Sequence, residues 1–111
     1  MLDIMSAIPA RTRDLIRLSK EEYVNKYLSQ YIGKSASLSE AARQLKTSPA
    51  QIGNNVSKGH IKKTGNDKNR VLVDLSDVAY MADAMTRLEL EKGQKVFNPD
   101  HTLYIPKVRL A

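Results

Sequence analysis

Cysteine is absent from this chain of 111 residues, so disulfides and cysteine-based metal sites are excluded. The two histidines, His60 and His101, are far apart and lack the spacing of paired metal ligands. No apolar run approaches the roughly 20 residues that span a membrane, and the N-terminus is too short and interrupted for a signal peptide. We therefore expect no metal, no membrane partner and a location in the cytoplasm.

A catalytic constellation is also missing from the sequence. It contains no glycine-rich phosphate loop, no set of histidines and carboxylates at ligand spacing, and no nucleophile motif. Several serines stand where helix caps are expected, which accounts for them without chemistry. We therefore expect that the chain is not an enzyme, has no catalytic residue and needs no cofactor.

Positive charge is in excess and unevenly placed. The net charge is +6 and the isoelectric point about 9.7. Residues 1–75 hold 13 basic and 7 acidic residues, whereas residues 76–111 hold 5 of each. An anionic partner is therefore expected to meet the N-terminal two thirds of the chain.

Residues 37–59 are the segment around which the rest is organised. Ser37 is followed three residues later by Glu40, and Ser48 by Gln51, which is the pattern of a capping box at the start of a helix. Each cap precedes a short apolar stripe that recurs at helical spacing. Two short amphipathic helices joined by a tight turn predict a helix-turn-helix, whose second helix can enter a DNA major groove.

The second of these helices, residues 49–58, supplies the predicted base contacts. Ile52 and Val56 line its inner side, and amide, lysine and methyl groups on the other side match the edges of adenine, guanine and thymine. The candidates are Ala50, Gln51, Asn54, Ser57 and Lys58, with Asn55 at the margin of the face. The alternative is an ordinary solvated polar face without a ligand.

A β-hairpin is predicted after the second helix. Residues 60–64 and 70–75 favour strands, and residues 65–69 are rich in turn formers. Lysine and arginine gather near its tip, where they can contact phosphate or simply solvate and protect a sheet edge. The predicted phosphate contacts are Lys62, Lys63, Lys68 and Arg70 on the hairpin, and Lys46, Thr47 and Ser48 at the helix N-terminus.

The flanking segments are less distinctive. Residues 1–13 are predicted to be a flexible arm, and Asp14–Leu18 fits either a strand or one helical turn. Ser19 is predicted to cap a helix that ends at Gly33. Its tyrosines recur beside Val, Leu and Ile, so we interpret them as core residues rather than a base-stacking surface.

The C-terminal third is predicted to hold one helix and an extended tail. Ser76 is the expected cap of the helix and Gly93 its end. In the tail, residues 94–111, two strand-like pieces at 102–105 and 107–110 flank Pro106. The tail can lie on its own core or cross to a second subunit, and we favour the second.

The run EAARQLKTSPAQIGNNVSKG resembles the helix-turn-helix of phage Cro-type repressors, and LIRLSKEEYV and RVLVDL resemble that family's opening strand with first helix and its hairpin strand. The resemblance covers about residues 14–76. It implies that Asp14–Leu18 is a strand in the hairpin's sheet, and it carries a base-reading role onto Asn54. Lys46 replaces the glycine common in the family's turn.

The same region, through SLSEAA, GHI, RVLV and SDV, is also similar to the winged-helix excisionase and MerR-like group, in which a helix-turn-helix precedes a DNA-touching wing. The expected fold is α+β: a helix-turn-helix with a β-hairpin wing and a small antiparallel sheet, plus a C-terminal helix and an extended tail. Residues 14–93 form the DNA-binding domain in this interpretation.

The expected function is sequence-specific binding of double-stranded DNA as a transcriptional regulator. The Cro resemblance implies a homodimeric repressor of phage or plasmid origin, acting in the cytoplasm of a bacterial or phage-infected cell. The alternatives are an excisionase-like architectural protein that bends DNA, and an antirepressor or adaptor that uses the helix-turn-helix to bind protein.

Overall fold

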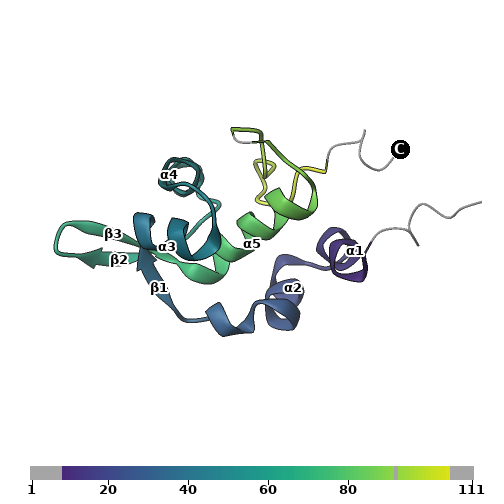
Figure 1. Cartoon of the computed structure of the whole chain (residues 1–111), viewed down its shortest axis with the longest axis horizontal. Coiled ribbons are helices and arrows are strands. Elements are labelled where there is room, and N and C mark those ends of the chain that lie inside the picture. Colours follow the sequence, from purple (N-terminus) through teal and green to yellow (C-terminus); the bar gives the residue numbers. More distant parts are fainter. Residues whose placement is uncertain (1–8, 92, 106–111) are drawn as a thin grey trace, which may run out of the picture.

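A computed structural model describes residues 9–91 and 93–105, and it has the predicted α+β architecture. In Figure 1, α5 runs through the middle of the molecule, α3 and α4 lie above it, α1 and α2 lie below it, and the hairpin projects at the left end. The elements in chain order are α1 (Ala10–Arg17), α2 (Lys20–Tyr27), the 3-10 helix η2 (Ser29–Tyr31), β1 (Ser35–Ser37), α3 (Leu38–Leu45), α4 (Pro49–Ser57), β2 (Lys63–Asp67), β3 (Arg70–Asp74) and α5 (Leu75–Arg87).

The helix-turn-helix is confirmed, and its caps are those that the sequence predicts. The hydroxyl of Ser37 accepts a hydrogen bond from the backbone N–H of Glu40, and that of Ser48 accepts one from Gln51. The turn begins at Lys46, which adopts a left-handed backbone with φ 55°. Lys46 therefore adopts a conformation that favours glycine.

The hairpin is confirmed with a tighter turn than predicted. Its two central residues, Lys68 and Asn69, both have positive φ, as a two-residue turn between twisted strands requires. Pairing therefore continues through residues 65–67, which the sequence suggested were turn. The antiparallel order is β1-β3-β2.

The predicted strand at Asp14–Leu18 is wrong, because this segment belongs to helix α1. Leu15 is only 1% exposed, and the Asp14 carboxylate accepts hydrogen bonds from Lys26 and the Tyr27 hydroxyl on α2. The strand that completes the sheet is β1, which pairs with β3 and directly precedes α3. Residues 10–13 are likewise helical rather than a flexible arm, and residues 1–8 lie outside the described part of the chain.

The core surrounds α5, and it includes Tyr23, one of the tyrosines that the sequence predicts to be core residues. Tyr23 is fully buried, and its hydroxyl donates to Asp83 at 2.7 Å and accepts from Arg11 at 2.9 Å. Burial, followed by the hydrogen bond to Asp83, raises the pKa of Tyr23 to about 12. This contact joins α1, α2 and α5, so Tyr23 is a packing residue, as the sequence indicates.

The boundaries of α5 differ from the prediction at both ends. Asp74, not Ser76, caps the helix, because its carboxylate accepts from the Ser76 N–H and hydroxyl. The helix ends at Arg87, and Glu89 is the first left-handed residue after it, well before Gly93. A carboxylate therefore takes the capping role that the sequence assigned to a hydroxyl two residues later.

The tail, over its described part, packs on the chain's own core. Val96 and Phe97 are 2% and 5% exposed, and Phe97 pairs with Leu103 in an isolated antiparallel bridge. The predicted strand at 102–105 is reduced to this bridge. The predicted piece at 107–110 lies outside the described residues.

Lys46→Gly is expected to stabilise the fold by about 0.5–1 kcal/mol, because glycine adopts the left-handed turn without the clash of a Cβ. Lys46→Ala is the matched control, since it removes the charge and keeps the strain. Urea unfolding of the three proteins measures the difference. An equal gain in both variants would assign the effect to the charge instead.

Candidate nucleic-acid interface

The surface of α4 is divided sharply between a buried and an exposed side. Ile52 is fully buried, and Val56 is half-buried beside it. The exposed residues include four of the six predicted base contacts: Ala50, Asn54, Ser57 and Lys58. These four follow one another at helical spacing, so they form one continuous face.

Two predicted base contacts are buried: Gln51, which was predicted on the outer side of α4, and Asn55, which was predicted at its margin. Gln51 is 7% exposed and its Oε1 accepts from the backbone N–H of Gly93, and Asn55 is 4% exposed with its Nδ2 donating to the Gln51 carbonyl. Asn55 Nδ2 also lies 3.3 Å from the sulfur of Met81 on α5. The inner side of α4 is therefore wider and more polar than its two apolar residues suggested.

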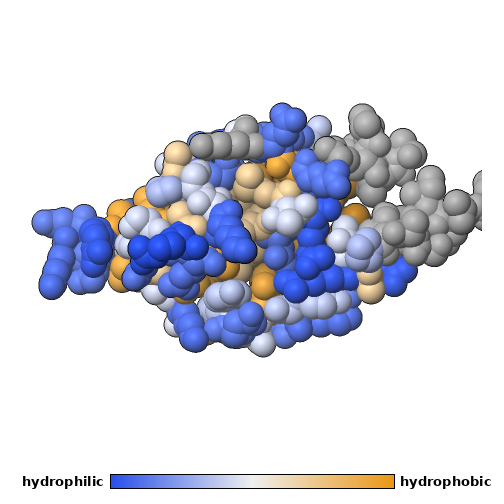
Figure 2. Space-filling model, viewed as in Figure 1, coloured by the Kyte–Doolittle hydropathy of each residue, from blue (hydrophilic) through white to orange (hydrophobic). Residues whose placement is uncertain are grey.

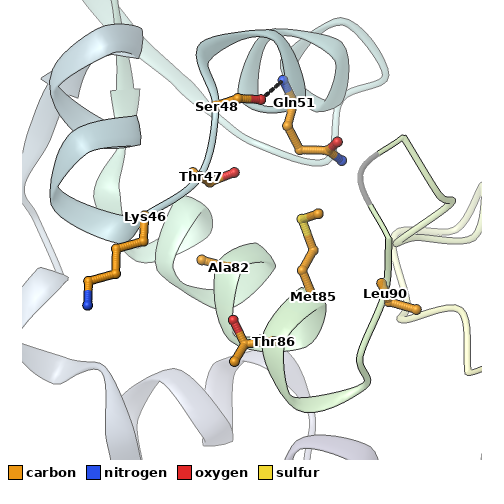
Figure 3. Close-up of a pocket in the computed structure, with 8 residues that line it drawn as sticks. All are labelled: Lys46, Thr47, Ser48, Gln51, Ala82, Met85, Thr86 and Leu90. Carbon is orange, nitrogen blue, oxygen red and sulfur yellow. Dashed lines mark hydrogen bonds between the residues drawn. The ribbon is translucent and has the colours of Figure 1, made fainter.

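A cavity of about 360 Å³ lies between the helix-turn-helix and α5. In Figure 3 the Gln51 side chain reaches down from α4, and its amide points toward Met85 on α5. Thr47 and Ser48, two of the predicted phosphate contacts, line the same cavity and are half-buried, and the Ser48 hydroxyl already caps α4. Lys46 is exposed at the edge of this cavity.

The four predicted phosphate contacts of the hairpin are all exposed. They are Lys62, Lys63, Lys68 and Arg70. Arg70 lies 3.4 Å from the Asp67 carboxylate, an exposed pair of low energy that leaves the guanidinium accessible. The backbone N–H of Lys62 donates to the buried Asp77 on α5, which fixes the base of the hairpin. Figure 2 shows that the hairpin end of the molecule is hydrophilic.

The C-terminal segment, residues 93–105, is a neighbour of α4 that sequence reasoning missed. A cavity of about 530 Å³ separates the two, and its polar lining includes Asn54 and Lys58 from α4 and Gln94 and Lys95 from the segment. Figure 1 shows the segment above α5, on the same side as α4. The turn formers at 98–100 between two apolar pairs were the available signal for a local turn.

His60 and His101 join the end of α4 to this segment. Their Nδ1 atoms are 2.8 Å apart, so one ring donates its proton to the other. His60 also packs on Phe97, with ring centroids 4.8 Å apart. Burial lowers the pKa of His60, and the charges of His101, Lys58 and Lys20 lower it further.

Within residues 9–91 and 93–105, no three histidine, cysteine or carboxylate side chains are grouped so that they could hold a metal ion. The pair of histidines connects the end of α4 with the C-terminal segment, two parts of the chain that are 41 residues apart.

Asn55→Ala is expected to destabilise the protein by about 1–3 kcal/mol, because it removes a buried hydrogen bond and leaves the contact with Met81 unfilled. Asn54→Ala is the matched control from the adjacent position, and its exposed side chain predicts a change below about 0.5 kcal/mol. Chemical unfolding measures both. Equal losses would contradict the division of α4 into two sides.

Stability is expected to decrease as the pH falls below about 6.5, the ordinary pKa of histidine, because the fold favours the neutral form of His60. The stabilisation is complete above that pH. As the pH falls, His60 binds a proton in the unfolded chain at a higher pH than in the folded chain, so the stabilisation is lost. His60→Gln should flatten the dependence between pH 7.5 and about 5.5. Urea midpoints of both proteins test this, and parallel curves would assign the dependence to other groups.

Comparison with known proteins finds no matching family model, no matching curated protein and no matching solved structure. Within the described residues, none of the helices has the length and apolar character needed to cross a bilayer. The resemblance to Cro-type and winged-helix proteins therefore stays a prediction.

Proposed function

We propose that the chain is a sequence-specific regulator that inserts α4 into the major groove of double-stranded DNA. The observation that carries the proposal is the exposed face of α4, on which Asn54 has an amide directed away from the core while the buried side fixes the helix. A helix held in this way, with exposed residues on its outer side, matches the requirement for reading base edges.

The side chains on the exposed face of α4 can form specific contacts with bases. The Asn54 amide can pair with the two Hoogsteen-edge groups of adenine, and the methyl of Ala50 can contact the methyl of thymine. Lys58 can reach guanine acceptors or a phosphate. Gln51 and Asn55 no longer belong to this set, because their amides are committed to the interior.

The hairpin supports the proposal through charge. Lys62, Lys63 and Lys68 are exposed cations, and none of the three lies in an ion pair within the described residues. Contacts of this kind hold the backbone whatever its sequence, and they release counterions on binding. The hairpin therefore supplies affinity, and α4 supplies base preference.

One copy of α4 covers only a few base pairs, so useful specificity favours two copies on a near-palindromic site. We infer a homodimeric repressor of the Cro type that acts in the cytoplasm by covering a promoter. The helix α5 is mostly buried in its own subunit. A dimer contact would therefore use other surfaces.

A second candidate is an architectural protein of the excisionase kind, and the strand order favours it. Strand β1 leads directly into α3, and α4 leads to the hairpin, whereas the Cro resemblance implied a helix between the strand and the helix-turn-helix. DNase footprinting separates the two candidates. A single protected palindrome indicates the repressor, and cooperative protection of direct repeats indicates the architectural protein.

Binding to DNA is expected to weaken steeply with salt, and two variants should affect it differently. Lys62→Ala with Lys63→Ala should lower affinity alike on all sequences, whereas Asn54→Ala should relax the preference for one base by about 1–3 kcal/mol. Selection from random DNA followed by gel shifts on the selected and a scrambled duplex measures both effects.

The matched control replaces Arg13 and Arg17 with alanine, which removes the same charge from α1 at the opposite end of the molecule from the hairpin (Figure 1). Affinity that hardly depends on salt, or equal weakening by the control, would argue for the protein-binding adaptor instead.

A further inference from the structure

The cavity between α4 and the C-terminal segment is open to solvent and brings two lysines to its lining. Lys58 comes from the end of α4, and Lys95 comes from the segment. Asn54 and Gln94 add two exposed amides beside them. Four groups that donate hydrogen bonds, two of them charged, therefore line one cavity next to the helix that is proposed to enter the major groove.

Neither lysine of this cavity is neutralised by the protein. No carboxylate of residues 9–91 or 93–105 forms an ion pair with Lys58 or Lys95. The Lys95 ammonium lies 5.0 Å from the centre of the Tyr104 ring, a contact that orients the cation without removing its charge. Two uncompensated cations on facing elements attract an anion.

The segment is held firmly enough to present Lys95 at a fixed place. Val96 and Phe97, the next two residues, are buried, and the Gly93 N–H donates to the Gln51 side chain at 3.3 Å. The backbone N–H of Tyr104 donates to the Val96 carbonyl at 2.9 Å, which closes the segment on itself. Lys95 thus stands between two points that are tied to α4 or the core.

We propose that the C-terminal segment is a second DNA-contacting element, in which Lys95 and Lys58 together bind one phosphate of the strand that borders α4 in the major groove. This inference depends on the proposed function. A phosphate of the duplex fits because its charge is negative, its oxygens accept from ammonium groups, and it recurs along the edge of the groove. The phosphate contacts proposed for the hairpin are separate from this contact of Lys95 and Lys58.

The experiment compares Lys95→Gln and Lys58→Gln with the parent protein on a labelled random-sequence duplex at two salt concentrations. Each variant is expected to bind about five- to tenfold more weakly near 0.1 M salt, with the slope of log affinity against log salt reduced by about one. Because both lysines are exposed, the urea midpoints should not change. Arg17→Gln, an equal loss of charge on α1, is the control and should leave the affinity unchanged.

Unchanged or tighter binding by Lys95→Gln would overturn the inference, and tighter binding would mean that the segment obstructs DNA. The hairpin variant with Lys62 and Lys63 replaced separates this failure from failure of the proposed function. If that variant weakens salt-dependent binding while Lys95→Gln does not, only the segment's role is wrong. If the parent protein binds the duplex without salt dependence, the DNA-binding proposal itself fails.

Discussion

The contact of the inner side of α4 with α5 is the constraint on which the candidate site depends. Asn55 is at its centre, because its Nδ2 donates to the Gln51 carbonyl and approaches the sulfur of Met81, while its own carbonyl accepts from the N–H of His60 and of Ile61. A rotation of α4 by one residue would break the contact of Asn55 with Met81 and the hydrogen bond from Gly93 to the Gln51 side chain, and it would expose other α4 side chains to the core. The rotation of α4, and thus the identity of its exposed residues, is fixed by polar contacts as well as by Ile52.

This constraint explains why the sequence predicts the helix α4 correctly but does not predict that Gln51 and Asn55 are buried. In α4, four residues with an amide or hydroxyl side chain accompany the two apolar residues Ile52 and Val56. With so narrow an apolar stripe, a helical wheel does not predict that Gln51 lies on the buried side. The residues that contact the two buried amides, Met81 and Gly93, are far from α4 in the sequence. A buried amide therefore looks like a base-reading one until its tertiary partners are known.

Other features divide in the same way between local and distant causes. The caps at Ser19, Ser37 and Ser48 follow from a hydroxyl and the N–H three residues later, so the sequence predicts them directly. Strand β1 is only three residues long and exists because β3 pairs with it, so its side chains carry little sign of it. Residues 14–17 of α1 were predicted to be a strand because a short apolar run suits a strand and a helix alike, and the contacts of Asp14 with α2 decide between them.

The C-terminal segment changes how the charge of the molecule is understood. By composition the last third is neutral and irrelevant to an anionic partner, yet folding places Lys95 on the lining of the same cavity as Lys58. The Asp100 carboxylate of this segment accepts hydrogen bonds from Thr102. The contact between His60 and His101 holds this arrangement at the end of α4, so the position of the segment and that of the helix depend on each other. A net charge counted along the chain therefore underestimates the positive surface around α4, because the surface is assembled from segments whose own charge is balanced.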